Sequence, residues 1–170
     1  MRKTLFESLT RRPFTEKLAA TPADPEIARM AAELDVKARR RLGRSLSLRL
    51  VDAGSCNACE LELNALSNPY YDLERFGLRF VASPRHADVL LVTGPVTKNM
   101  REALLRTYDA MPAPKWVVAV GDCAACGGLY ADSYACERGA DAVLPVNLRI
   151  VGCPPSPNQL LEGLLALLSP

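Results

Sequence analysis

Six cysteines are the residues of this 170-residue chain whose type and spacing could do chemistry. Four of them form two CxxC pairs, a fifth precedes two prolines, and the sixth stands apart: Cys56 and Cys59, Cys123 and Cys126, Cys153, and Cys136. Glycines stand beside the first five, as they do where backbone wraps closely around an inorganic group. Thiolates in such groups are typical ligands of zinc and of iron–sulfur clusters.

The residues alone allow three interpretations of these thiols. Disulfides need an oxidising compartment, and the opening segment has basic residues but no long apolar stretch of the kind that predicts export. A structural zinc site could use both CxxC pairs, Cys56 with Cys59 and Cys123 with Cys126, as four sulfur ligands. An iron–sulfur cluster also takes four thiolates and accepts ligands scattered along the chain. The single histidine, His86, excludes most mixed cysteine–histidine sites, so a cluster is favoured, but the spacing leaves open which four cysteines bind.

Short apolar runs alternate with helical patterns and predict the elements that must position the cysteines. Strands are predicted at 45–51, 78–82, 89–93 and 116–120, with a further short apolar run at 148–151 and helices over 97–108 and 159–168. This order indicates an α/β fold with an open parallel sheet, flavodoxin-like in outline. Such sheets bind ligands beyond the carboxyl ends of their strands, so we expect five of the cysteines on loops at one edge.

The charge divides the chain into two predicted parts. Residues 1–44 carry eleven Lys and Arg against six Asp and Glu, a net charge of +5, whereas residues 45–170 carry a net charge of −3. The first part is predicted to be a basic helical N-terminal arm and the second a cluster-binding α/β domain. A helix is expected from Pro25 to Arg44, with Asp24 as its N-cap and Gly43 at its end. The arm is either a solvated extension or a segment that docks on a larger subunit or on anionic headgroups.

Composition and missing motifs exclude several functions. The chain is 49% hydrophobic and 24% charged, and its net charge of +2 is too small to indicate nucleic acid as a partner. No run of about 18 apolar residues predicts a membrane-spanning helix. The sequence contains neither G-x-G-x-x-G nor a P-loop, which gives no support for nucleotide binding. With His86 as the only histidine, a serine hydrolase is disfavoured.

Four motifs of the chain resemble one known family. They are SCNACELE at 55–62, SPRHAD with VTGPVT at 83–97, GDCA at 121–124 and VGCPP at 151–155. Together they resemble the small subunits of membrane-bound, energy-converting [NiFe]-hydrogenases, of the formate hydrogenlyase type. This group belongs to the superfamily of the B subunit of respiratory complex I, an NADH-quinone oxidoreductase. The resemblance covers about residues 45–168.

The resemblance implies a cofactor and its ligands. The cluster ligands of the family fall on Cys56, Cys59, Cys123 and Cys153, which would hold one [4Fe–4S] cluster. Cys126 would line the cluster pocket, and Cys136 would be a small buried apolar residue. Complex I subunits usually begin the site with two adjacent cysteines, whereas this chain has CxxC, a departure that favours the hydrogenase branch.

The resemblance also implies a role within a complex. The chain would relay electrons between a large subunit that holds a nickel–iron site and ferredoxin-like iron–sulfur subunits, and would itself make and break no substrate bond. Membrane subunits of the same complex would hold it peripherally on the cytoplasmic side of the membrane. Two alternatives stay open. One is a complex I B subunit that passes electrons to quinone beside a D-subunit-like protein, and the other is a zinc-stabilised α/β interaction module with no redox role.

Three acidic residues lie beside the expected ligands. Glu62 matches an acidic position of the family, three residues after the second cysteine, and is either a coupling or proton-path carboxylate or an interface or helix-terminus charge. Glu60 is expected to be a first-turn partner of the helix dipole. Asp122 is expected either to tune the cluster or to cap its loop.

Overall fold

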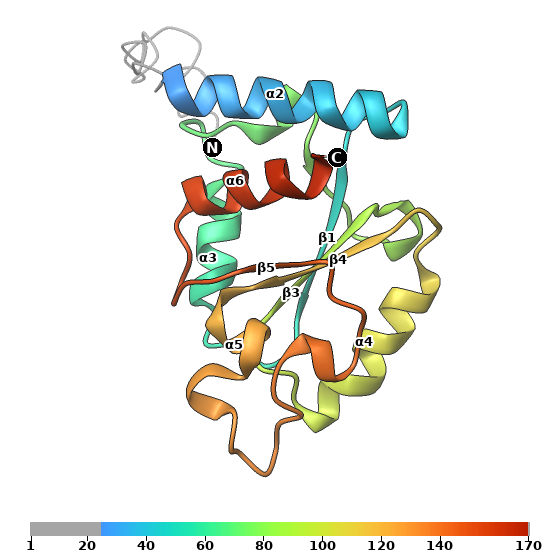
Figure 1. The fold of residues 1–170 in the computed structure, drawn as a ribbon, viewed down its shortest axis with the longest axis vertical. Coiled ribbons are helices and arrows are strands. Elements are labelled where there is room, and N and C mark those ends of the chain that lie inside the picture. Colours follow the sequence, from blue (N-terminus) through green and yellow to red (C-terminus); the bar gives the residue numbers. More distant parts are fainter. Residues whose placement is uncertain (1–24, 170) are drawn as a thin grey trace, which may run out of the picture.

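Five parallel strands form the single sheet of the computed structural model, which describes residues 25–169 (Figure 1). Their spatial order is β2-β1-β3-β4-β5, the flavodoxin-like order, so the predicted fold class is confirmed. The strands are β1 (Ser47–Asp52), β2 (Arg79–Phe80), β3 (Val89–Thr93), β4 (Trp116–Val120) and β5 (Leu148–Ile150). The two central strands, β3 and β4, are runs of apolar residues because helices cover both faces of the sheet.

Helices lie on both faces of the sheet. They are α2 (Pro25–Leu42), α3 (Ala58–Ala65), α4 (Lys98–Ala110), α5 (Gly121–Cys126) and α6 (Pro157–Leu168), with short 3-10 turns η1 (Leu73–Phe76), η2 (Pro84–His86), η3 (Gly128–Tyr130) and η4 (Ala140–Ala142). One core cluster joins α2, α3 and α6 to one face of the sheet, and a second joins α4 and α5 to the other. None of the helices among residues 25–169 is long and apolar enough to cross a membrane.

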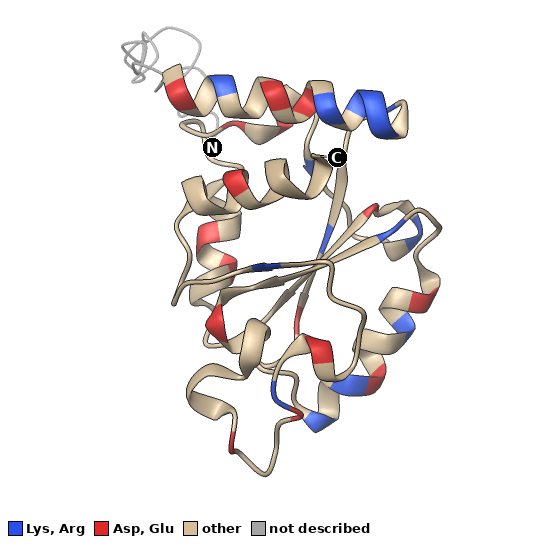
Figure 2. Cartoon of the chain, in the orientation of Figure 1, with Lys and Arg blue, Asp and Glu red and all other residues tan. Residues whose placement is uncertain are grey.

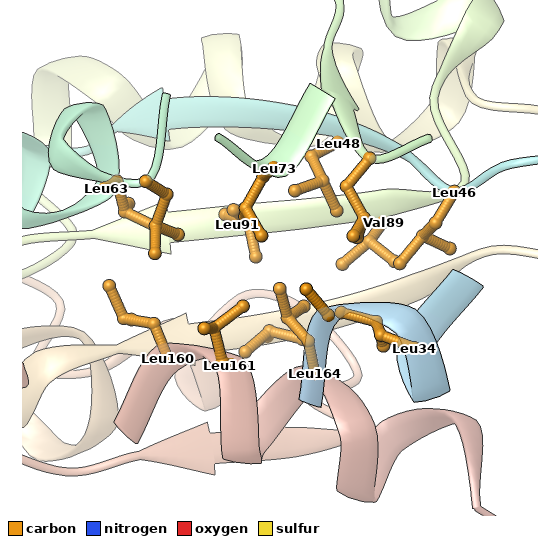
Figure 3. Packing of buried hydrophobic residues seen from close by; sticks show 14 of the residues in the cluster. Leu34, Leu46, Leu48, Leu63, Leu73, Val89, Leu91, Leu160, Leu161 and Leu164 are labelled. Atoms are coloured by element: carbon orange, nitrogen blue, oxygen red, sulfur yellow. The ribbon is translucent and has the colours of Figure 1, made fainter. Parts of the chain in front are cut away.

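The larger core is made mainly of leucines from both ends of the chain. Figure 3 shows Leu160, Leu161 and Leu164 of α6 and Leu34 of α2 facing leucines and a valine of the sheet and of its neighbouring elements. All four of these leucines are 1% exposed or less. The helix α6 begins with a capping box, in which the Ser156 hydroxyl accepts from the Gln159 amide and the Gln159 side chain accepts from the Ser156 amide.

The predicted helix of the basic arm is confirmed and is built into the core. It begins at Pro25 and ends at Leu42, with three arginines in its last turn and Gly43 in a left-handed conformation. One face of α2, from Ile27 to Ala38, is buried and packs on α6. The expected N-cap, Asp24, and the rest of residues 1–24 lie outside the described residues, and the domain division at residue 44 stays a prediction.

Three cysteines expected on loops lie on helices instead. Cys59 is in the first turn of α3, while Cys123 and Cys126 both belong to α5, which starts directly where β4 ends. The prediction of loops rested on the position of these cysteines after the strands, where parallel sheets bind their ligands. In the structure, Gly121 makes the sharp turn out of β4 with a φ of +85°, and the alanines that follow it favour a helical turn.

The core packing predicts an unequal response to leucine truncation. Leu161→Ala removes a fully buried side chain between α6 and the sheet and is expected to lower the free energy of unfolding by about 2–5 kcal/mol. Leu61→Ala truncates a leucine that is 61% exposed and is expected to cost less than about 1 kcal/mol. Denaturant unfolding of both variants checks this, and equal losses would contradict the packing described here.

Candidate functional site: a recess lined by four cysteines

A recess at the carboxyl edge of the sheet brings four cysteines together. Cys56, Cys59, Cys123 and Cys153 line it, and its other walls come from the same segments and from the turn after β3. The space at this recess that atoms do not fill, including open solvent at its mouth, is about 300 Å³. Its four thiols arrive from the ends of β1, β4 and β5, where the parallel sheet directs its turns.

The first pair of cysteines is positioned by a chain of short hydrogen bonds after β1. The Asp52 carboxylate accepts from the amides of Gly54 and Ser55, at 2.7 and 2.6 Å. The Ser55 hydroxyl in turn accepts from the amide of Asn57, at 3.0 Å. Asn57 has a φ of 71°, a left-handed conformation that asparagine tolerates, and α3 starts at the next residue. These turns place Cys56 and Cys59 on either side of the start of α3.

Asp122 joins the two other cysteine segments. Its backbone amide donates to the Gly152 carbonyl at 2.9 Å, and its carboxylate accepts from the Gly152 amide at 2.8 Å. Cys123 and Cys153 each follow one of these residues, so the reciprocal pair of bonds fixes the spacing of the two segments. This is the loop-capping contact considered for Asp122, whereas an effect on a cluster stays a prediction.

The glycine at the start of α5 leaves room beside a thiol. A Cβ atom on Gly121 would lie 2.6 Å from the Cys59 sulfur, closer than real Cβ contacts, so any larger residue would displace the thiol or the turn. On the next segment, a Cβ on Gly152, whose φ is +141°, would lie 2.6 Å from the Cα atom of Pro155. The cradle around the thiols therefore depends on residues without side chains, as expected where backbone encloses an inorganic group.

Burial changes the acidity of two of the recess thiols, Cys59 and Cys123. Burial, followed by the neighbouring negative charges of Glu60, Cys123, Cys56 and Cys153, raises the pKa of the Cys59 thiol to about 12. Burial and then the charges of Cys153, Cys56, Asp122 and Cys126 raise the pKa of Cys123. Cys59 therefore keeps its proton at neutral pH when nothing is bound, and a cationic group that binds here must displace protons.

The two remaining cysteines lie outside this recess. Cys126 is exposed, its thiol donates to the Asp122 carbonyl at 3.3 Å, and it borders a neighbouring hollow that also touches Cys123 and Cys153. Cys136 is half-buried, and its backbone forms an isolated antiparallel bridge with Thr97. The structure thus separates the four recess cysteines from the two that the resemblance does not assign as ligands.

The acidic residues of α3 differ from the expectation in one respect. Glu62 is half-buried, whereas Glu60 is only 6% exposed. Neither carboxylate oxygen of Glu60 has a hydrogen-bond partner. Sequence reasoning treated Glu60 as an ordinary first-turn charge. The signal that it missed is helical spacing, because Glu60 lies three residues before the buried Leu63 and so shares the inward face of α3.

The four thiols line one shared space. Among residues 25–169, no three side chains of His, Cys, Asp or Glu are placed so that they could hold a single metal ion. A zinc ion needs its four ligands at about 2 Å from one centre, whereas each thiolate of a four-iron cluster binds a different iron atom. The arrangement and the glycine cradle fit the larger group.

Comparison with known families agrees with this site. The family described as the 20 kDa subunit of NADH ubiquinone oxidoreductase matches residues 56–167, a region that contains all four recess cysteines. The chain belongs to this family. The resemblance seen in the sequence motifs is thereby confirmed.

One curated relative in this family is formate hydrogenlyase subunit 7 of Escherichia coli (strain K12). It is 44% identical over 140 residues, which cover 82% of this chain and 53% of the relative. The chain therefore spans about half the length of that curated relative.

Two solved structures are similar to the fold. A chain of the membrane-bound sulfane sulfur reductase, an archaeal respiratory membrane complex, aligns with a TM-score of 0.66 and 33% identity over 81% of this chain and 73% of that chain. A chain of NAD+-reducing [NiFe]-hydrogenase in the H2-reduced state aligns with a TM-score of 0.56 and 19% identity, over 72% and 92% of the respective chains. The second likeness concerns the fold alone.

The pKa of Cys59 predicts slow alkylation in the chain without a bound group. Only the thiolate reacts with iodoacetamide, so Cys59 is expected to react at least about 100-fold more slowly than the exposed Cys126 at pH 8. Its rate is expected to keep rising with pH up to about 12, where the thiol titrates. Peptide mass spectrometry gives both rates. In urea the difference should vanish, and equal rates in the folded chain would contradict the burial of Cys59.

Proposed function

We propose that this chain is an electron-relay subunit that holds one [4Fe–4S] cluster through Cys56, Cys59, Cys123 and Cys153. The observation that carries the proposal is the meeting of these four thiols, from three distant segments, in one glycine-lined recess. When bound, the cluster supplies one-electron transfer through soft sulfur ligands. The chain contributes the thiolates, a cradle of fixed geometry and the electrostatic surroundings that set the cluster's potential.

The recess supports this ligand set over the zinc alternative. The zinc hypothesis needs Cys126 beside Cys56, Cys59 and Cys123, but Cys126 does not line the recess, whereas Cys153 does. This lining favours the ligand set of the cluster over that of the zinc site.

The position of the site at the surface supports a relay. Cys56 and Cys153 are exposed, so an electron at the site lies within a short distance of any protein docked over this edge. Leu129, which borders the hollow that touches Cys123 and Cys153, is 92% exposed, and Val151, two residues before Cys153, is 63% exposed. Exposed apolar side chains gathered beside a site are typical of surfaces that dock on another subunit.

The proposed partners follow from the family. We place a large subunit with a nickel–iron site against this edge and ferredoxin-like subunits further along the electron path. Membrane subunits would hold the assembly at the cytoplasmic face, with this chain peripheral. The CxxC spacing and the 44% identity to a formate hydrogenlyase subunit favour the hydrogenase branch. A complex I-like subunit that serves quinone is the second candidate, favoured by the description of the matching family.

Metal analysis of protein purified without oxygen tests the cofactor. We expect about four iron atoms and negligible zinc per chain, with the absorption and electron paramagnetic resonance spectra of a four-iron cluster. About one zinc and no iron would instead identify a structural metal site and would overturn the proposal.

Serine variants test the ligand set. Cys153→Ser is expected to lose or convert the cluster, lowering iron below about four atoms per chain, because a hydroxyl oxygen is a harder and poorer ligand. Cys126→Ser is the matched control: it changes a neighbouring exposed thiol outside the recess and is expected to keep its iron and its spectrum. Iron loss in the control, or an unchanged spectrum in Cys153→Ser, would show that the ligands are assigned wrongly.

If this apolar surface docks on a partner subunit, changing it should impair assembly of the complex without affecting the cluster. Replacing Leu129 and Val151 with Ser should reduce co-purification of partner subunits at least about tenfold while iron per chain stays constant, because neither side chain lines the recess. Val36→Ser alters an exposed apolar residue on α2, outside this surface, and serves as the control. Co-purification that survives in the double variant would remove this surface from the interface.

A further inference from the structure

Glu60 is a buried carboxylate without a partner, one residue after a proposed cluster ligand. Its residue is 6% exposed, and both of its oxygens lack a hydrogen bond. None of the ion pairs found among residues 25–169 includes it. A buried charge in this condition is rare in proteins because it loses its hydration without replacement, so its presence calls for an explanation.

The other buried carboxylate of the described chain shows how such a group is normally accommodated. Asp88 is 2% exposed and accepts from both terminal nitrogens of Arg44, at 2.6 and 3.1 Å, and from the Ser47 amide at 2.9 Å. Asp88 therefore ties the amino ends of β1 and β3 together. Glu60 has no such structural contact, which removes the usual reason for a buried acid.

The surroundings of Glu60 are acidic as well. The three segments that contain the proposed ligands, residues 52–66, 121–137 and 151–163, include no Lys or Arg. Their acidic residues are Asp52, Glu60, Glu62, Asp122, Asp132, Glu137 and Glu162. Figure 2 shows the same pattern on α3, which carries acidic positions and no basic one. No neighbouring side-chain cation on these segments is available to offset the charge of Glu60.

The start of α3 is a favourable position for a negatively charged side chain. Glu60 is in the first turn of α3, where amides without intrahelical acceptors carry partial positive charge. The residue before the helix, Asn57, makes no side-chain capping bond to them. A carboxylate in that turn is favoured by the helix dipole without being neutralised by a counter-ion.

We propose that the negative charge of Glu60 lowers the reduction potential of the cluster, acting as a positioning residue through Cys59. This inference rests on the proposed function. Reduction brings one further electron to the group at Cys59, with no bond broken and no proton moved. The charge of Glu60 opposes that electron, and it does so strongly because burial leaves little water between the two. Net charge and surroundings are the levers by which proteins set cluster potentials.

A reductive titration with dithionite, followed by electron paramagnetic resonance, tests the inference. The full chain is isolated without oxygen, with any subunits that accompany it, and iron per chain is measured in each sample. Glu60→Gln keeps the size of the side chain and removes its charge. At a fixed solution potential we expect the ratio of reduced to oxidised cluster to rise about tenfold, a midpoint about 59 mV more positive for one electron.

Two further variants separate charge from structure. Glu60→Asp keeps the charge and is expected to stay close to the wild-type midpoint. Glu102→Gln removes an exposed charge on α4, on the opposite face of the sheet, and is expected to leave the midpoint unchanged. If Glu60→Gln holds no iron, Glu60→Met removes the charge without introducing a new buried polar group.

The outcomes distinguish the inference from the function on which it rests. A wild-type chain without iron would overturn the proposed function and the inference together. An iron-loaded Glu60→Gln with the wild-type midpoint would overturn the inference alone. Iron lost in both neutral variants but kept in Glu60→Asp would assign the carboxylate to assembly of the site and would also overturn it. A positive shift in a neutral variant, absent from Glu60→Asp and Glu102→Gln, supports it.

Discussion

The reciprocal hydrogen bonds between Asp122 and Gly152 tie the turn after β4 to the turn after β5, and the geometry of the recess depends on them. Two of the four recess cysteines follow these residues directly, so the bonds fix how far apart the Cys123 and Cys153 segments stand. The sheet makes the contact possible. Because β4 and β5 run parallel and pair at Val120 and Ile150, both turns leave the sheet at the same edge. A single carboxylate then joins them, and its bonds are directional enough to hold the cysteine backbones in register.

Sequence patterns were sufficient for the sheet and for the grouping of four cysteines. The buried runs at 89–93 and 116–120 appear as strands with the predicted bounds, since apolar residues bounded by Gly, Pro or Asp have few alternatives in an α/β chain. Motif resemblance singled out Cys153 and set Cys126 aside, although CxxC spacing alone had paired Cys126 with Cys123. That distinction depends on the path of the chain after β4 and β5, which no local pattern contains.

Features that depend on tertiary packing could not be predicted from the sequence pattern. The cysteines of α5 were expected on a loop because they follow a predicted strand, yet the residues between Gly121 and Gly127 form a helical turn. Glu60 lies in the first turn of α3 as expected, but its burial was not predicted, since burial depends on which face of α3 meets the core. The basic residues of α2 indicated a polar side of this helix. The packing of its other side on α6 was not predicted.

The pairing of α2 with α6 has a consequence for how the domain is completed during synthesis. The helix that leaves the ribosome first among the described elements packs on the one that leaves last. Arg41 of α2 donates to the Leu167 carbonyl in the last turn of α6, and Lys37 donates to the Ser169 hydroxyl just beyond it. The segment with Cys153 lies directly before α6. Until α6 emerges, the apolar face of α2 has no helix to cover it and the recess lacks a wall. Closure of the core and completion of the thiol set are therefore late events that coincide.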